Sequence, residues 1–152
     1  MLVLPLAATL STADVYAEAD RLGLARTHEE LSQCRAELNA ALEHGAPLPA
    51  ATELLHNDLQ RAAVSLCPQI AEVLREARAA GADLALVSGS GPTVLGLFAG
   101  VNSGLDGPAL AEQAAGNLHG RLPPVICAWP VPATFAEAMT DAEPTRPGRD
   151  QG

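Results

Sequence analysis

The sequence predicts an α+β fold: an antiparallel sheet in the ferredoxin-like order βαββαβ, with helices on one face and extra helices in the first crossover. Three observations lead to this class. Short runs of aliphatic and β-branched residues occupy positions 2–6, 84–87, 93–98 and 125–129. Helix-like spacing of apolar residues fills the long interval after the first run and the short interval before the last. About five residues separate the two middle runs, which favours an antiparallel hairpin.

Four amphipathic helices are expected between the first two strands. Ser11 or Thr12 can cap a helix that ends near Gly23. Thr27 and Glu30 form a capping box that starts the second helix, and the segment APLPA follows it. The apolar stripe of this second helix consists of Leu31, Cys34, Leu38 and Leu42.

The third and fourth helices follow directly. A third helix over 55–66 places Asn57 and Asp58 within it, where both residue types are poor helix formers. Their side chains are therefore expected either to bond a neighbouring loop or to lie on an exposed turn. Pro68 begins a fourth helix that ends at Gly81.

The end of the chain carries one more helix and one more strand. Asp106 is predicted to begin a helix that runs to about His119, and the alternating segment VICAW at 125–129 forms the last strand. Beyond it prolines recur and the pattern fades. We therefore expect one domain at 1–130 and a proline-rich, disordered tail at 131–152.

The composition limits the classes of function. The 152 residues, 48% hydrophobic and 18% charged, indicate a globular protein with one core. A net charge of −9 repels nucleic acids and anionic membranes, so any anion site has to be local. The chain contains no lysine, which excludes a Walker A loop and Schiff-base chemistry.

The cysteines and histidines form neither a metal-binding nor a disulfide pattern. Cys34, Cys67 and Cys127 are widely spaced, and we interpret them as small buried side chains in a reducing cytoplasm. No two histidines have the spacing of paired metal ligands; they are His28, His44, His56 and His119. The N-terminal segment lacks the basic residues of a signal peptide, so a cytoplasmic location is expected.

The loop SGSGP at 88–92 has two interpretations. Gly89 and Gly91 allow backbone angles in which successive N–H groups point together at an anion. Alternatively the glycines only close a hairpin, although a two-residue turn would be enough for that. The loop is not a dinucleotide fingerprint, because Val94 stands at the third glycine position. It is not a nucleophile elbow, because Ser88 stands where glycine is required.

The first helix carries further polar and aromatic candidates. Asp14, Glu18 and Asp20 lie near Thr12 and either line a cleft or belong to an exposed helix turn. Tyr16 is the only tyrosine, and its residue type favours a place in the core.

Three segments, in this order and spacing, resemble a known enzyme family. They are LSTADVY at 10–16, NDLQRAAVSLCPQIAEV at 57–73 and GADLALVSGSGPTVLGLF at 81–98. Together they resemble the C-terminal part of the 4-diphosphocytidyl-2-C-methyl-D-erythritol kinases of the GHMP kinase superfamily. SGSGPT alone resembles the third motif of the whole superfamily. The resemblance covers roughly residues 2–130 and implies the C-terminal domain of such a kinase.

The resemblance implies transfer of the ATP γ-phosphoryl group, with Mg²⁺, to the 2-hydroxyl of the cytidine-linked methylerythritol in isoprenoid biosynthesis. Thr12 and Tyr16 match positions that border the cytidine pocket, with Tyr16 matching an aromatic side chain that packs on the base. The resemblance also implies a segment that lies beside the family's phosphate-binding loop and the reacting end of the substrate; it consists of Ser88, Gly89, Ser90, Gly91, Pro92 and Thr93.

The catalytic groups of the family match no residue of this chain. Its glycine- and serine-rich nucleotide loop and its N-terminal lysine are absent, and no aspartate matches the motif of the catalytic aspartate. We therefore expect no catalytic residue, no metal ligand, no tightly bound cofactor and no kinase activity of this chain alone. It is expected to be a fragment or a truncated product whose partner is the missing N-terminal half. Its exposed domain interface can drive self-association.

Two alternatives stay open. Another GHMP kinase, such as homoserine kinase, would keep the SGSGPT loop without using cytidine. A stand-alone ferredoxin-like binding or regulatory module would keep the scaffold without catalysis.

Overall fold

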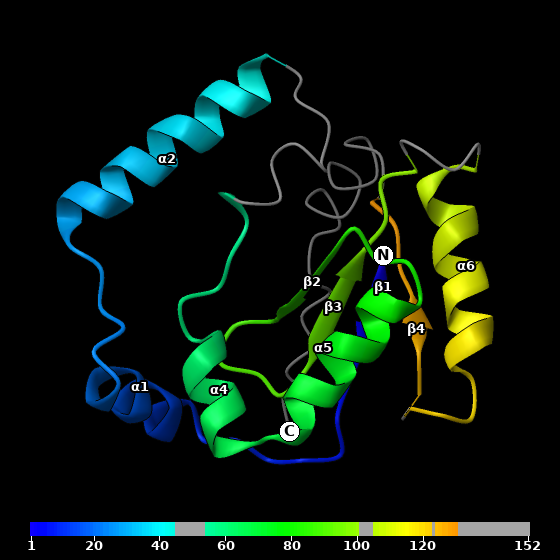
Figure 1. Ribbon diagram of the computed structural model, residues 1–152, viewed down its shortest axis with the longest axis horizontal. Coiled ribbons are helices and arrows are strands. Elements are labelled where there is room, and N and C mark those ends of the chain that lie inside the picture. Colours follow the sequence, from blue (N-terminus) through cyan, green and yellow to red (C-terminus); the bar gives the residue numbers. More distant parts are fainter. Residues whose placement is uncertain (45–53, 101–104, 123, 131–152) are drawn as a thin grey trace, which may run out of the picture.

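The computed structural model describes residues 1–44, 54–100, 105–122 and 124–130 (Figure 1). The elements, in chain order, are β1 (Leu2–Leu4), α1 (Thr12–Arg21), α2 (His28–Glu43), α4 (Gln60–Leu66), α5 (Gln69–Ala79), β2 (Leu84–Val87), β3 (Val94–Leu97), α6 (Gly107–Leu118) and β4 (Ile126–Cys127). None of the helices in these ranges has the length and apolar character needed to cross a membrane. The tail expected at 131–152 lies outside the described residues.

The strands form one antiparallel sheet in the order β2-β3-β1-β4. Helices α1, α2, α4 and α5 lie in the connection from β1 to β2, and α6 lies in the connection from β3 to β4. The predicted βαββαβ class, with extra helices in its first crossover, is thereby confirmed. Helix α5 lies across β2 and β3, and α6 lies beside β4 (Figure 1).

One face of the sheet forms the core, because the strand register aligns its buried side chains. Leu4 pairs with Val94, which in turn pairs with Val87, and all three are at most 2% exposed. In the next row Leu2 pairs with Gly96. The buried residues of α5 are those of its predicted apolar stripe: Ile70, Val73, Leu74 and Ala77.

The other face of the sheet is also apolar. Val3 pairs with Leu95, and Leu95 pairs with Leu86; all three are partly exposed. Strands that are apolar on both faces appear in the sequence as continuous runs, which explains why LALV and VLGL show no alternation with polar residues. Leu86 and Leu95 belong to the floor of the site described below.

The predicted capping signals are confirmed. Ser11 caps α1, with its side chain accepting from the backbone N–H of Asp14. At the start of α2, the Glu30 N–H donates to Thr27 Oγ1 at 3.2 Å and the Thr27 N–H donates to Glu30 Oε2 at 2.7 Å, as a capping box requires. Asp106 caps α6 in the same way. These helix starts depend on neighbours in sequence only.

The apolar stripe of α2 does not reach the core. No residue of α2 is buried, and the helix stands apart from the sheet (Figure 1). Cys34 on this stripe is only partly buried for that reason, and Cys127 is partly buried because it lies on the edge strand β4, so only Cys67 is buried as expected. Leu31 and Leu42 are 49% and 65% exposed, and self-association through such a surface stays a prediction.

The third helix begins later than predicted. Helix α4 starts at Gln60, so the placement of Asn57 and Asp58 within a helix was wrong. Asn57 Oδ1 accepts a hydrogen bond from the Leu59 N–H at 3.0 Å, and the Gln60 N–H donates to the Asn57 carbonyl at 3.0 Å. A side chain that bonds the backbone two residues ahead stabilises a turn in place of a helix.

Ile70 should contribute strongly to stability, because it is completely buried among the residues of the core. We expect Ile70→Ala to lower the free energy of unfolding by about 2–5 kcal/mol through lost apolar burial and a cavity, measured by urea unfolding. Leu42→Ala is the control, since Leu42 is 65% exposed on α2, and its effect should stay within about 0.5 kcal/mol. Equal losses in both variants would contradict this core.

Candidate functional site

The connection between β2 and β3, residues 88–93, forms a loop that we call the SGSGPT loop. The Ser88 N–H donates to the Thr93 carbonyl at 2.8 Å, and the Gly91 N–H donates to the Ser88 carbonyl at 2.9 Å. Gly89 and Gly91 have φ angles of +56° and +83°, in the region that favours glycine. A Cβ on Gly91 would also lie 3.1 Å from Val87 Cγ1. The backbone of this loop therefore favours glycine at position 89 and requires it at position 91.

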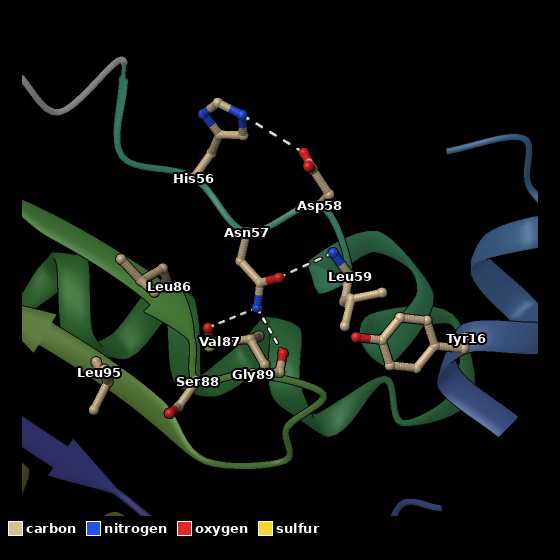
Figure 2. A pocket seen from close by; sticks show the side chains of 10 residues that line it. All are labelled: Tyr16, His56, Asn57, Asp58, Leu59, Leu86, Val87, Ser88, Gly89 and Leu95. Carbon is tan, nitrogen blue, oxygen red and sulfur yellow. Dashed lines mark hydrogen bonds and ion pairs between the residues drawn. The ribbon is translucent and has the colours of Figure 1, made fainter. Parts of the chain in front are cut away.

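The segment before α4 holds the start of this loop. Asn57 Nδ2 donates to the Val87 carbonyl at 2.8 Å and to the Gly89 carbonyl at 2.7 Å (Figure 2). Gln60 Oε1 accepts from the Val87 N–H at 3.0 Å. Since β2 is an edge strand, these side chains satisfy backbone groups that a further strand would otherwise pair. The expectation that Asn57 bonds a neighbouring loop is confirmed.

Helix α1 brings two predicted site residues to this region. Thr12 Oγ1 and Ser90 Oγ lie 3.0 Å apart, within hydrogen-bond distance. Tyr16 is 55% exposed, so its expected place in the core was wrong. Val15 and Ala19, one turn apart, form the buried side of α1, and Tyr16 lies about 100° further around the helix. The tyrosine ring is therefore available at the surface.

One pocket of about 560 Å³ joins Tyr16 to the loop (Figure 2). Of the predicted site residues, Tyr16, Ser88 and Gly89 line it; the other five do not, and they are Thr12, Ser90, Gly91, Pro92 and Thr93. The lining also includes His56, Asn57 and the apolar floor from the sheet. The tertiary structure thus brings a residue of the first helix and the start of the loop, over 70 positions apart, into one cavity.

A second, smaller pocket of about 210 Å³ shares Tyr16, Asp58 and Leu59 with the first. Arg26 Nη2 lies 2.8 Å from Asp58 Oδ1 and lines this second pocket. Of the three acidic residues considered as cleft residues on α1, Asp20 lines it, whereas Asp14 and Glu18 line neither pocket. Tyr16 therefore contributes to the walls of two adjoining cavities.

Backbone groups, not cations, are the donors that the larger pocket offers to an anion. Its lining contains no arginine; its ionisable side chains are Tyr16 and the pair His56 and Asp58, whose Nε2 and Oδ1 atoms are 3.5 Å apart. The N–H group of Gly89, which lines the pocket, has no hydrogen-bond acceptor among the described residues. Unpaired N–H groups and serine hydroxyls in a glycine-rich turn can bind an anion.

The part of the chain that the structure describes contains no set of side chains suited to bind a divalent metal ion. Mg²⁺ prefers carboxylate oxygens. No group of three histidine, cysteine, aspartate or glutamate side chains is placed to hold a metal ion among the described residues. These residues therefore do not fit a magnesium site.

Several pocket residues carried little signal in the sequence. No sequence pattern gave His56 a binding role, and an exposed turn was as good an interpretation of Asn57 and Asp58 as a contact with a loop. Asn57 and Gln60 are three residues apart at the start of a helix, and this spacing could have indicated two polar side chains on the same side of the chain. The sequence does not show that both of them bond the edge strand at Val87.

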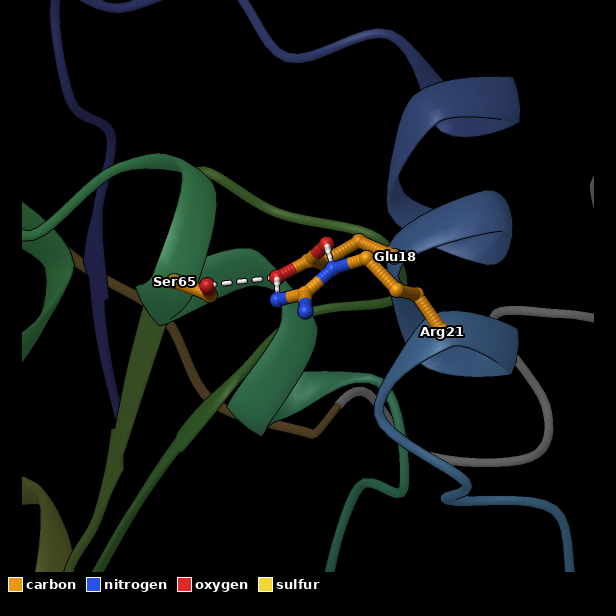
Figure 3. Close-up of polar contacts among 3 residues, drawn as sticks. All are labelled: Glu18, Arg21 and Ser65. Atoms are coloured by element: carbon orange, nitrogen blue, oxygen red, sulfur yellow. Dashed lines mark hydrogen bonds and ion pairs between the residues drawn. The ribbon is translucent and has the colours of Figure 1, made fainter.

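An ion pair on α1 and a hydrogen bond from α4 connect these two helices (Figure 3). Arg21 forms a two-pronged contact with Glu18, with Nε to Oε2 at 2.6 Å and Nη2 to Oε1 at 2.7 Å. Ser65 Oγ on α4 donates to Glu18 Oε1 at 2.6 Å. The hydrogen bonds from Arg21, and next that from Ser65, lower the pKa of Glu18 from 4.5 to about 2. This contact fixes the helix that carries Tyr16.

Titration of Glu18 tests this cluster. Because its pKa is lowered in the folded chain, its contribution to stability is complete above pH 4.5 and is lost as the pH falls toward about 2. We expect Ser65→Ala to raise the pKa of Glu18, measured by carboxyl NMR titration, since one donor to the ionised form is removed. Ser32→Ala, on α2, should leave this pKa unchanged. A Glu18 that titrates near 4.5 in the unmodified chain would show that the cluster does not form.

Comparison with known proteins places this domain. Residues 35–123, more than half of the chain, match the family described as GHMP kinases C terminal. A 4-diphosphocytidyl-2-C-methyl-D-erythritol kinase of Mycolicibacterium smegmatis is 45% identical over 126 residues, covering 73% of this chain and 37% of that protein. The kinase of the same name from Corynebacterium diphtheriae is 45% identical over 84 residues, covering 55% of this chain and 25% of that protein.

The chain therefore spans only 25% to 37% of the length of these two relatives. The crystal structure of a 4-(cytidine 5'-diphospho)-2C-methyl-D-erythritol kinase has a similar fold, with a TM-score of 0.57 and 26% identity. That similarity covers 82% of this chain and 40% of the other. The matched residues, the relatives and the shared fold agree, and the chain belongs to the GHMP kinases C-terminal family.

Proposed function

We propose that this chain is the substrate-side domain of an ATP-dependent kinase that phosphorylates the 2-hydroxyl of 4-diphosphocytidyl-2-C-methyl-D-erythritol in non-mevalonate isoprenoid biosynthesis. One observation carries the proposal: a single pocket joins an exposed aromatic ring, Tyr16, to the glycine-rich turn at Ser88 and Gly89. A cytidine diphosphate group offers a flat base at one end and an anionic diphosphate at the other. The names of the curated relatives support the same substrate.

The pocket residues have distinct roles in this proposal. Tyr16 stacks on the cytosine ring, since aromatic side chains bind nucleobases through their faces. The start of the SGSGPT loop lies along the phosphates and offers the N–H group of Gly89. Thr12 contacts Ser90 and so connects the helix of Tyr16 with the loop.

Catalysis itself would depend on another part of the kinase. Phosphoryl transfer requires cations that neutralise the developing charge and groups that position the nucleophile. The chain contains no lysine, and its described residues offer no metal site. We therefore assign ATP, Mg²⁺ and the catalytic lysine and aspartate to an N-terminal half and expect this domain alone to be inactive.

Binding of cytidine diphosphate to this chain tests the assigned pocket. Stacking of a base on an aromatic ring is worth about 1–3 kcal/mol, so Tyr16→Ala should weaken binding by about tenfold or more. Tyr16→Phe keeps the ring and should bind like the unmodified chain. The affinities can be measured by NMR titration.

A loop variant separates the two ends of the pocket in the same titration. Gly89→Val should abolish binding, a larger effect than that of Tyr16→Ala, because a β-branched residue disfavours the φ of +56° and so distorts the loop. Gly89→Asn is its control, since asparagine tolerates this region and no atom lies within 4 Å of an added Cβ. Cytidine diphosphate binding that survives both Tyr16→Ala and Gly89→Val would exclude this pocket.

A phosphorylation assay tests the division of labour between the two halves. The chain alone should give no ATP-dependent phosphorylation of 4-diphosphocytidyl-2-C-methyl-D-erythritol, whereas mixing it with the N-terminal half of a close relative should give turnover. Homoserine as acceptor is the control and should give none, which distinguishes the other GHMP kinase considered above. Turnover by the chain alone would contradict the assignment of the catalytic groups to another half.

A further inference from the structure

The segment 57–59 crosses the larger pocket from the end assigned to the phosphates to the end assigned to the base. At the first end, Asn57 Nδ2 donates to the Gly89 carbonyl at 2.7 Å. At the second end, Leu59 lies beside the Tyr16 ring (Figure 2), and these two residues line both pockets. Asp58 stands between Asn57 and Leu59 in the chain and lines both pockets as well. It is therefore placed between the two ends.

Asp58 carries the only carboxylate among the described residues that line the larger pocket. Its Oδ1 is occupied, because Arg26 Nη2 lies 2.8 Å and His56 Nε2 lies 3.5 Å from it. Its Oδ2 has no hydrogen-bond or ion-pair partner among the described residues. The side chain is 41% exposed, so a ligand can reach this oxygen. The contact with Arg26 thus holds the carboxylate by one oxygen and leaves the other as a free acceptor.

The covalent order of a nucleoside diphosphate decides which part of it meets this acceptor. With the base on Tyr16 and the diphosphate at Gly89, the ribose lies between them, because the sugar joins the two groups. Asp58 shares the second pocket with Tyr16, whereas Gly89 does not line that pocket, so Asp58 lies on the base side of the sugar. The 2'-hydroxyl is the ribose hydroxyl nearer to the base.

A hydroxyl can donate a hydrogen bond, and an ionised carboxylate can only accept one. Carboxylates bind the ribose 2'-hydroxyl in this way in other nucleotide sites. We infer that Asp58 Oδ2 accepts a hydrogen bond from the ribose 2'-hydroxyl, so that the pocket selects ribonucleotides over 2'-deoxyribonucleotides. This inference rests on the proposed function and assigns it a residue that determines specificity for the sugar.

A structural role is the alternative for Asp58. Its ion pair with Arg26 connects the segment 57–59 to the chain between α1 and α2. Loss of such a connection would change the affinity for every ligand of the pocket by a similar factor. Loss of a contact with the 2'-hydroxyl would change the affinity only for ligands that have this hydroxyl. The two roles therefore differ in the ratio of two affinities.

The test compares cytidine 5'-diphosphate with 2'-deoxycytidine 5'-diphosphate, each titrated into ¹⁵N-labelled chain. The unmodified chain should bind the ribonucleotide about tenfold more tightly, since hydrogen bonds to charged groups are among the stronger ones. In Asp58→Ala the two affinities should agree within about twofold. Both probes carry the same diphosphate, so the loss of a negative charge at position 58 affects both affinities alike and cancels in their ratio.

Asp20→Ala is the matched control. Asp20 lines the second pocket together with Tyr16, but it does not line the larger pocket. This substitution removes the same charge close to the aromatic ring and should leave the preference for the ribonucleotide unchanged. A preference that disappears in both variants would show an effect of charge without a contact, and it would overturn the role of Asp58.

A measurement on the unmodified chain covers the case in which Asp58→Ala does not fold. At saturation, the ribonucleotide should shift the carboxyl ¹³C resonance of Asp58 more than the deoxyribonucleotide does. Equal shifts, equal affinities of the unmodified chain for the two probes, or a preference that survives in Asp58→Ala would each overturn the role of Asp58 and leave the proposed function standing. An unmodified chain that binds neither probe overturns the proposed function, and the role of Asp58 falls with it.

Discussion

The outer edge of β2 is the constraint on which the site depends. An edge strand leaves alternate N–H and carbonyl groups without a neighbouring strand, and each such group that is not in water needs a partner. In this domain the partners are side chains: Arg78 at Ala85, and Asn57 with Gln60 at Val87. Because Asn57 also holds the Gly89 carbonyl, the same solution that protects the edge determines the path of the loop that follows.

The second constraint is the position of α1. Val15 and Ala19 pack into the core while Arg21, Glu18 and Ser65 form the polar contact that links α1 to α4. Helix α4 in turn follows directly after the turn that contains Asn57. Helix α1, which carries Tyr16, contacts α4, and the SGSGPT loop contacts Asn57 just before α4. Both walls of the pocket are therefore held by the same segment of the chain. Movement of α1 would change both cavities that Tyr16 lines.

The electrostatics of the chain are consistent with a domain that contributes part of a site. A net charge of −9 opposes anion binding at long range, and the pocket has no arginine in its lining. Hydrogen bonds from backbone N–H groups act only at contact distance, and they supply geometry more than attraction. In the proposed function, such a site would select the orientation of a diphosphate, while cations from another part of the kinase would supply most of the charge.

The sequence by itself determined the elements and their order, because the signals for them are local. The capping box of Thr27 and Glu30 and the stripe of α5 act between residues a few positions apart, and the apolar runs of β2 and β3 are joined by one short loop. The tertiary structure decided which face of α1 is buried, and so where Tyr16 lies, and which distant backbone groups Asn57 bonds, since Val87 and Gly89 are 30 and 32 positions away. Residue type placed Tyr16 in the core; packing of Val15 and Ala19 left it outside. The period of the apolar residues shows which face of a helix or strand is apolar. Only the assembled sheet shows which element packs on that face and which side chains bond the edge of the sheet.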